Sequence, residues 1–190
     1  MPTVYLQAII HCAERGKAVS SVLEECHLLA VRLSDLYSRY HKVYATAESL
    51  TAGLIGATIV EIPGSSAWFD RGFITYSNEA KQQLLGVSAE ILKDYGAVSM
   101  QTVRQMVSGA LDSSIADIAV AVTGIAGPDG GSREKPVGTV WIGVQQRGNP
   151  SYARCFLFAG SRQEVRNQTV LESLKALVSV TEGLIPQQYS

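Results

Sequence analysis

Apolar residues between Val19 and Tyr37 recur at intervals of three and four positions. This spacing places them on one face of an α-helix, so we expect one long amphipathic helix there; the segment before it could form another short helix. Similar spacing, with start and stop signals, predicts further helices at residues 51–61, from about Asn78, from about Ser88, around residues 103–111 and at residues 161–182.

Five short runs have the composition of β-strands, at residues 42–46, 68–76, 117–122, 139–144 and 152–158. The run at 117–122 is almost wholly apolar, which is typical of a strand covered on both faces. The last two runs flank Arg147, Gly148, Asn149 and Pro150, which predicts a hairpin. Because strands alternate with helices before this hairpin, we expect a three-layer α/β/α sandwich with a mixed, mostly parallel sheet.

The composition fits a globular protein with one core. The chain has 190 residues, of which 46% are hydrophobic and 17% charged. No repeat or long linker divides it, so we expect a helical N-terminal extension at residues 1–27 and one domain at residues 28–185. The formal net charge is -1, without the basic surplus of a general nucleic-acid binder, so no stable nucleic-acid binding is expected.

The three cysteines, Cys12, Cys26 and Cys155, lie far apart and form no CxxC pair. This excludes a zinc ribbon and a full disulfide framework, and it favours reduced thiols in a cytosol. The N-terminus lacks the basic segment and cleavage site of a signal peptide, and no run approaches the ~20 apolar residues of a membrane span. We therefore expect a cytoplasmic protein.

Several catalytic classes have no support in the sequence. All three histidines, His11, His27 and His41, lie in the N-terminal helical region, which disfavours a Ser-His-Asp triad. No P-loop is present, no dinucleotide fingerprint follows the first strand, and the G-x-S-x-G elbow is absent around Ser49. If Ser49 is a nucleophile, lysine is the leading candidate for its base.

Four segments, at residues 45–53, 71–81, 121–128 and 135–141, together resemble the CinA C-terminal domain family of nicotinamide-nucleotide amidohydrolases. A weaker fifth lies at residues 160–166, and the resemblance covers roughly residues 28–177. It implies the α/β sandwich, hydrolysis of nicotinamide mononucleotide to nicotinate mononucleotide and ammonia, no metal or other cofactor, and the stand-alone form of the domain. With the long apolar N-terminal helix, it also suggests a homodimer.

The sequence departs from the family pattern at two places. Leu50 and Ala52 stand where the family usually has Cys and Gly, and Ser161 stands where many members have Asp. Ala52 is harmless if its φ angle is negative, as in a first helical turn, and costly otherwise. These departures leave substrate choice less defined than reaction type.

The resemblance makes Ser49 the nucleophile and Lys81 its base. Ser49 lies where a strand gives way to a helix, so helix N–H groups could stabilise an oxyanion; alternatively, Ser49 or Thr51 is only an N-cap. Lys81 follows a cap at Asn78 or Ser77, and its pKa must fall by about 2–3 units for it to act as a base at neutral pH. Desolvation would have to supply most of that shift, and the alternative is a solvated surface lysine.

Tyr76 closes the strand before Lys81. Its phenol could relay a proton between Ser49 and Lys81, its ring could contact a cationic pyridinium, or it could be a buried sheet aromatic. Glu48 could orient the site or only solvate the turn. We group Glu48 and Thr51 with the candidate substrate-binding residues.

Two further segments suit an anionic nucleotide. Thr123 and Gly124 end a strand with small residues, where exposed N–H groups suit an anion, although a tight turn would also need glycine. Arg162 and Arg166 lie one turn apart behind a capping box of Ser161 and Glu164, and a phosphate bound there would offset their unfavourable place at a helix N-terminus. The alternative is a solvated helix face.

These residues leave two functions beside hydrolysis of nicotinamide mononucleotide. One is a non-catalytic nucleotide-binding module linked to competence or DNA repair, which would not need Ser49 and Lys81 together. The other is an amidohydrolase for a different substrate. Ammonia release from a panel of amides separates the three.

Overall fold

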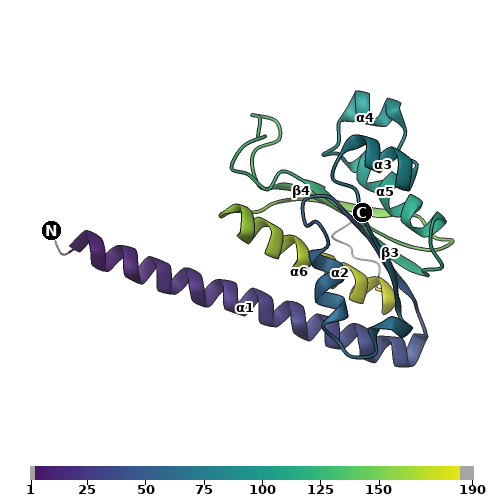
Figure 1. Cartoon of the computed structure of the whole chain (residues 1–190), viewed down its shortest axis with the longest axis horizontal. Coiled ribbons are helices and arrows are strands. Elements are labelled where there is room, and N and C mark those ends of the chain that lie inside the picture. Colours follow the sequence, from purple (N-terminus) through teal and green to yellow (C-terminus); the bar gives the residue numbers. More distant parts are fainter. Residues whose placement is uncertain (1–2, 185–190) are drawn as a thin grey trace.

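The computed structural model describes the backbone of residues 3–184 and the side chains of residues 21–184 (Figure 1). The elements in chain order are α1 (Thr3–Tyr40), β1 (Tyr44–Glu48), α2 (Leu54–Val60), the 3-10 turn η1 (Ser65–Ala67), β2 (Phe69–Ile74), α3 (Asn78–Leu85), α4 (Ala89–Tyr95), α5 (Met100–Asp112), β3 (Ile118–Gly124), β4 (Thr139–Gln146), β5 (Tyr152–Leu157) and α6 (Arg162–Thr181).

The five strands form one mixed sheet in the order β2-β1-β3-β4-β5. Strand β1 runs parallel to β2 and β3, whereas β4 is antiparallel to both β3 and β5. Glu48, the last residue of β1, lies opposite Ile74 of β2 and Val122 of β3. The carboxyl ends of the three parallel strands therefore meet at one edge of the sheet.

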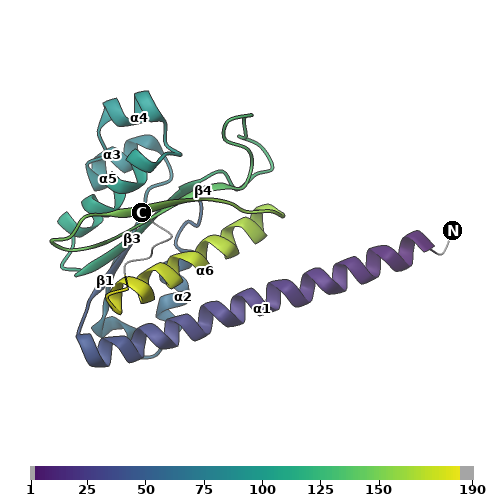
Figure 2. The same cartoon turned by 180° about the vertical axis from the view of Figure 1, so that it is seen from behind.

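Helices cover both faces of this sheet, as Figures 1 and 2 show from opposite sides. Helices α1, α2 and α6 pack on one face, and α3, α4 and α5 pack on the other. Strand β3 serves both cores: Ile118, Val120 and Val122 join the first, while Ala119 and Ala121 join the second. This arrangement explains the unbroken apolar run of β3 and confirms the predicted sandwich and hairpin.

Helix α1 is one continuous helix of 38 residues, where the sequence suggested two. The expected boundary between residues 27 and 28 lies inside it. Its second half packs along α6, where Arg32 donates to Glu182 at 2.6 Å and Lys175 pairs with Glu25 at 3.0 Å. The first turns of α1 extend away from the sheet (Figure 2). No helix among the described residues is both long and apolar enough to cross a bilayer.

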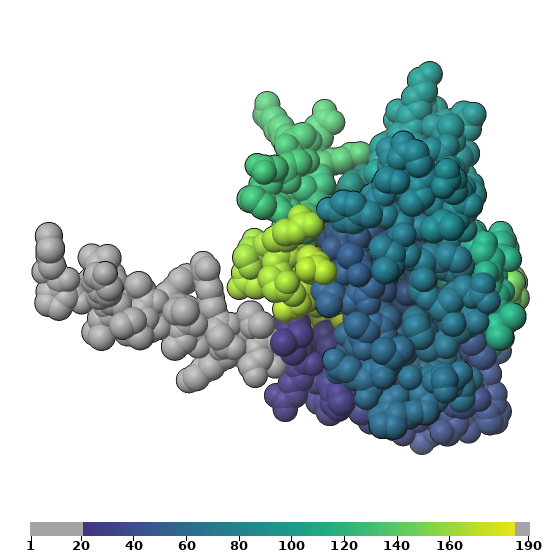
Figure 3. Space-filling view, in the orientation of Figure 1, coloured from purple at the N-terminus to yellow at the C-terminus, as the bar shows by residue number. Residues whose placement is uncertain are grey.

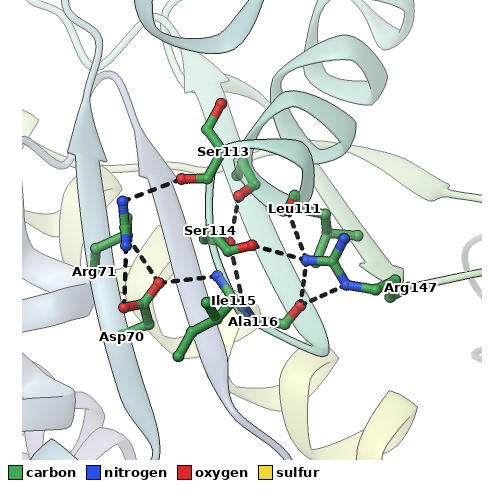
Figure 4. A network of polar contacts seen from close by, with 9 residues as sticks. Asp70, Arg71, Leu111, Ser113, Ser114, Ile115, Ala116 and Arg147 are labelled. Atoms are coloured by element: carbon green, nitrogen blue, oxygen red, sulfur yellow. Dashed lines mark hydrogen bonds and ion pairs between the residues drawn. The ribbon is translucent and has the colours of Figure 1, made fainter.

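A polar network stabilises the other end of the sheet, where the parallel strands begin (Figure 4). The Arg147 guanidinium donates to the carbonyls of Leu111, Ser114 and Ala116 at 2.7 to 3.1 Å, at the end of α5 and in the loop that follows. Asp70 accepts from Arg71 and from the amide of Ile115 in the same loop. A cation at these carbonyls also suits the negative end of the α5 dipole.

We expect Arg147→Ala to lower the free energy of unfolding by about 2 kcal/mol, because three carbonyl groups lose a charged donor. Any activity located at the carboxyl ends of the parallel strands should keep its kcat, since the network lies at the other end of these strands. Urea unfolding and steady-state kinetics on the same preparation measure both quantities. A tenfold fall in kcat would show that this end is coupled to the site.

Candidate active site

A pocket of about 180 Å³ opens at the carboxyl edge of the parallel strands. Six of the nine residues singled out in the sequence line it, namely Ser49, Tyr76, Lys81, Thr123, Gly124 and Arg162. The other three do not line the pocket: Thr51 belongs to the turn that follows Ser49, and Glu48 and Arg166 bind the backbone of that turn. In Figure 3 the green loop between β3 and β4 and the teal helices rise as separate lobes above the yellow-green start of α6.

Ser49 and Lys81 meet at the floor of this pocket. The Nζ atom of Lys81 lies 3.2 Å from Oγ of Ser49, although 32 positions separate the residues in sequence. Lys81 is only 1% exposed and Ser49 only 8%. The alternative interpretation of Lys81 as a solvated surface residue is therefore wrong.

Backbone carbonyls orient the Lys81 amine. Nζ donates to the carbonyl of Thr75 at 2.8 Å and to that of Tyr76 at 3.4 Å. A neutral amine has two N–H bonds and one lone pair, so these two carbonyls leave the lone pair for the hydroxyl of Ser49. Burial without an acidic partner lowers the pKa of Lys81 from 10.5 to about 8. Desolvation thus supplies the shift that a base at neutral pH requires.

The segment after Ser49 is a tight turn rather than the start of a helix. Helix α2 begins at Leu54, three residues later than predicted, with Gly53 at its N-cap position. Neither Ser49 nor Thr51 is an N-cap, so that alternative is wrong. Ala52 has a φ of 52° and Gly53 a φ of 96°, both in the left-handed region. Such a φ strains an L-residue, so Ala52 carries the cost anticipated for a positive angle.

Glu48 holds this turn from beneath. Its carboxylate is 1% exposed and accepts from the amides of Gly53, Ile55 and Gly56 at 2.9 to 3.1 Å and from the Thr46 hydroxyl at 3.0 Å. The buried Glu48 is therefore neither a solvated turn residue nor a lining residue. Because it occupies these amides of α2, they are not available to an oxyanion, which corrects the expectation from sequence.

Two amides next to the nucleophile, those of Leu50 and Thr51, have no acceptor among the described residues. The N–H groups of Ser49 and Ala52 donate to the carbonyls of Val122 and Ser49, each at 3.2 Å. Because Leu50 lines the pocket and directly follows Ser49, we take its amide as the candidate donor to an oxygen atom bound beside Ser49.

Tyr76 lies two residues beyond β2, at the mouth of the pocket. Its side chain is 62% exposed, so the interpretation as a buried sheet aromatic is wrong. Its hydroxyl accepts from Nη2 of Arg162 at 3.2 Å. Since Lys81 contacts Ser49 directly, proton transfer between them needs no phenol relay.

Thr123 and Gly124 end β3 at the opposite wall. The Thr123 hydroxyl donates to the carbonyl of Ala97 at 2.8 Å, which ties this wall to the loop between α4 and α5. A Cβ atom on Gly124 would lie 2.7 Å from the carbonyl oxygen of Thr139. Glycine is therefore required here for packing against β4, whatever else the loop binds.

The two arginines of α6 have different surroundings. Arg162 lines the pocket, and its Nη1 donates to the carbonyl of Gly127 at 2.9 Å. Arg166 donates from Nε to the carbonyl of Leu50 at 3.1 Å and from Nη2 to that of Thr51 at 2.9 Å. The expectation that both face a common phosphate is therefore wrong for Arg166. The predicted capping box of Ser161 and Glu164 is confirmed.

Among the described side chains, no three His, Cys, Asp or Glu residues gather closely enough to hold a metal ion.

The fold and pocket define a three-layer α/β protein with a buried serine–lysine pair at the carboxyl edge of its parallel strands. The CinA C-terminal domain family model matches residues 27–181. The chain belongs to this family, as the sequence motifs indicated.

Named relatives agree with this assignment. The chain is 56% identical to the nicotinamide-nucleotide amidohydrolase PncC of Enterobacter agglomerans over 129 residues, which are 68% of this chain and 79% of the relative. It is 52% identical to the protein of the same name from Escherichia coli K12 over 132 residues, 70% and 80% of the two chains. Among solved structures, the competence/damage inducible protein CihA from Agrobacterium tumefaciens superposes with a TM-score of 0.81 at 45% identity, covering 82% of this chain and 95% of the other.

Proposed function

We propose that this protein hydrolyses the carboxamide of nicotinamide mononucleotide to nicotinate mononucleotide and ammonia, with Ser49 as nucleophile and Lys81 as base. The observation that carries the proposal is the 3.2 Å contact between the two side chains inside a pocket. The similarity to relatives named nicotinamide-nucleotide amidohydrolase supports the choice of substrate.

Acylation begins when the free amine of Lys81 accepts the proton of Ser49 and the alkoxide attacks the carboxamide carbon. The carbonyl oxygen becomes an oxyanion and receives the N–H of Leu50. Lys81 then gives its proton to the departing nitrogen, the C–N bond breaks, and ammonia leaves an ester between Ser49 and the nicotinoyl group. Lys81 next accepts a proton from water, which attacks the ester, and returns that proton to the oxygen of Ser49.

The charge of the substrate suits this base. The nicotinamide ring of the mononucleotide is a cation, and a cation near Lys81 disfavours the protonated amine. None of the described residues that line the pocket is an aspartate or glutamate, so no carboxylate offsets this effect. Bound substrate therefore keeps Lys81 in the form that accepts a proton. The exposed ring of Tyr76 is available for a cation–π contact.

Arg162 is the residue we assign to the phosphate, because it lines the pocket at the N-terminus of α6, where anions are favoured. We expect Arg162→Ala to raise KM for nicotinamide mononucleotide about tenfold or more, from loss of a charged hydrogen bond. KM for nicotinamide riboside, which lacks the phosphate, should change little. If KM rises equally for both substrates, Arg162 does not bind the phosphate.

The direct test is release of ammonia by the purified protein from nicotinamide mononucleotide, nicotinamide riboside, nicotinamide and a set of aliphatic amides. We expect turnover of the mononucleotide above the others. If only another amide is hydrolysed, the serine–lysine mechanism still holds and the proposed substrate is wrong. Binding of the mononucleotide without turnover would contradict the proposal and favour a nucleotide-binding module.

A further inference from the structure

The turn after Ser49 is held from above by one side chain of α6. Arg166 uses two nitrogen atoms to bind two consecutive carbonyl oxygens, those of Leu50 and Thr51, at 3.1 and 2.9 Å. Its remaining guanidinium nitrogen, Nη1, donates to Gln163 at 3.4 Å. All three nitrogen atoms of Arg166 are thus bonded within the protein, and the two carbonyls lie 116 and 115 positions away in sequence. Arg166 does not line the pocket.

These contacts determine which way the peptide groups of the turn face. In a trans peptide group the C=O and the N–H point in opposite directions. Fixing the carbonyl of Thr51 therefore fixes the amide of Ala52, which donates to the carbonyl of Ser49 at 3.2 Å. That carbonyl belongs to the same peptide group as the amide of Leu50, so the direction of the Leu50 N–H is set as well.

The turn needs such support because its backbone is strained. Ala52 has a left-handed φ of 52°, which an L-residue avoids unless its surroundings impose it. Glu48 holds the far end of the turn by accepting from Gly53, Ile55 and Gly56. Between Ser49 and Ala52, Arg166 is the one described side chain that binds the backbone carbonyls.

We propose that Arg166 is a positioning residue that aims the amide of Leu50 at the oxyanion formed on Ser49. This proposal rests on the function proposed above. Arg166 touches neither substrate nor the reacting atoms, and it acts through the peptide groups of residues 50–52. It should therefore stabilise the transition state rather than the bound substrate.

The test compares Arg166→Ala, which removes the guanidinium from two backbone carbonyls, with the control Arg147→Ala, which removes one from three carbonyls at the opposite end of the parallel strands. We expect Arg166→Ala to lower kcat about 100-fold and to change KM less than about threefold, the pattern of a misplaced oxyanion donor. Guanidinium ion at millimolar concentration should restore part of kcat in Arg166→Ala. If that variant does not fold, Arg166→Lys, which lacks the two-pronged geometry, should lose about tenfold in kcat.

A second measurement does not depend on the substrate. In labelling by a fluorophosphonate, an oxygen–phosphorus bond forms at Ser49, fluoride leaves, Lys81 takes the proton, and the phosphoryl oxygen occupies the oxyanion position. Labelling should slow in Arg166→Ala to the same extent as kcat. If the wild type is labelled but releases no ammonia from nicotinamide mononucleotide, the proposed substrate is wrong. The labelling rates of the wild type and Arg166→Ala would still decide the role of Arg166.

Two results would overturn the role of Arg166. A rise in KM with kcat and labelling unchanged would make it a substrate ligand. A loss of kcat no larger than in Arg147→Ala, without rescue by guanidinium, would reduce it to a stabilising contact.

Discussion

Replacing Ser49 by alanine is expected to lower kcat for the carboxamide about 10⁴-fold or more, because the acyl-enzyme can no longer form. KM should change little, since the hydroxyl is small and only 8% of Ser49 is exposed. Ammonia release measures the loss. Hydroxylamine, which traps a nicotinoyl ester as a hydroxamate, should yield hydroxamate with the wild type and none with Ser49→Ala.

Ser108→Ala is the matched control for Ser49→Ala. The Ser108 hydroxyl donates to Gln145 at 2.8 Å on the α5 face of the sheet, away from the pocket. The kcat of Ser108→Ala should therefore equal that of the wild type. If Ser49→Ala keeps kcat within tenfold of the wild type, water rather than serine is the nucleophile and the proposed mechanism is wrong.

Replacing Lys81 by methionine should have the second largest effect, a loss of at least about 10³-fold in kcat/KM, because the proton of Ser49 then has no acceptor. In the wild type, kcat/KM should rise tenfold per pH unit below the Lys81 pKa of about 8 and level off above it. The residual kcat/KM of Lys81→Met should not show this rise with pH. A wild-type profile that is flat between pH 6 and pH 9 would exclude Lys81 as the base.

Lys81→Met also changes how stability depends on pH. Because folding lowers the pKa of Lys81 from 10.5 to about 8, the unfolded chain binds more protons between these two values, and wild-type stability rises with pH across that window. The rise amounts to about 3 kcal/mol, and it is absent below about pH 8, where both states are protonated. Urea unfolding of both proteins at pH 7 and pH 10.5 should show the difference between them shift by this amount. An unchanged difference would mean that Lys81 is not desolvated.

The sequence predicts most of the fold because the relevant signals are local. The three- and four-residue spacing in α1, α5 and α6 and the apolar run of β3 each reflect a face or strand that is buried. The pairing of Ser49 with Lys81 follows from parallel strands, since both residues come shortly after neighbouring strands that end at the same edge. The structure therefore brings Ser49 and Lys81 into contact in one pocket, as the sequence led us to expect, and their catalytic roles stay predictions.

What the sequence does not predict depends on contacts between distant residues or on strain. Nothing local indicates that Ala52 adopts a left-handed angle, and this angle delays the start of α2. Glu48 lies in the strand before the turn, yet its carboxylate accepts from amides at the start of α2, five to eight residues later. In the usual N-cap the side chain binds amides only two or three residues ahead, so this contact is not predicted from sequence. Arg166 resembles an anion ligand by its place in a helix, but its partners are carbonyls 115 and 116 positions away. The homodimer, the cytoplasmic location and the domain boundaries stay predictions.

The order of the strands has a consequence for inactivation by heat. Strand β1, which leads to Ser49, lies between two neighbours, whereas β2, which leads to Lys81, is an edge strand paired on one side only. Edge segments open at lower free-energy cost than central ones. We therefore expect fraying of β2 to separate the amine from the hydroxyl before the two cores melt, so that activity is lost at a lower temperature than the tertiary circular-dichroism signal.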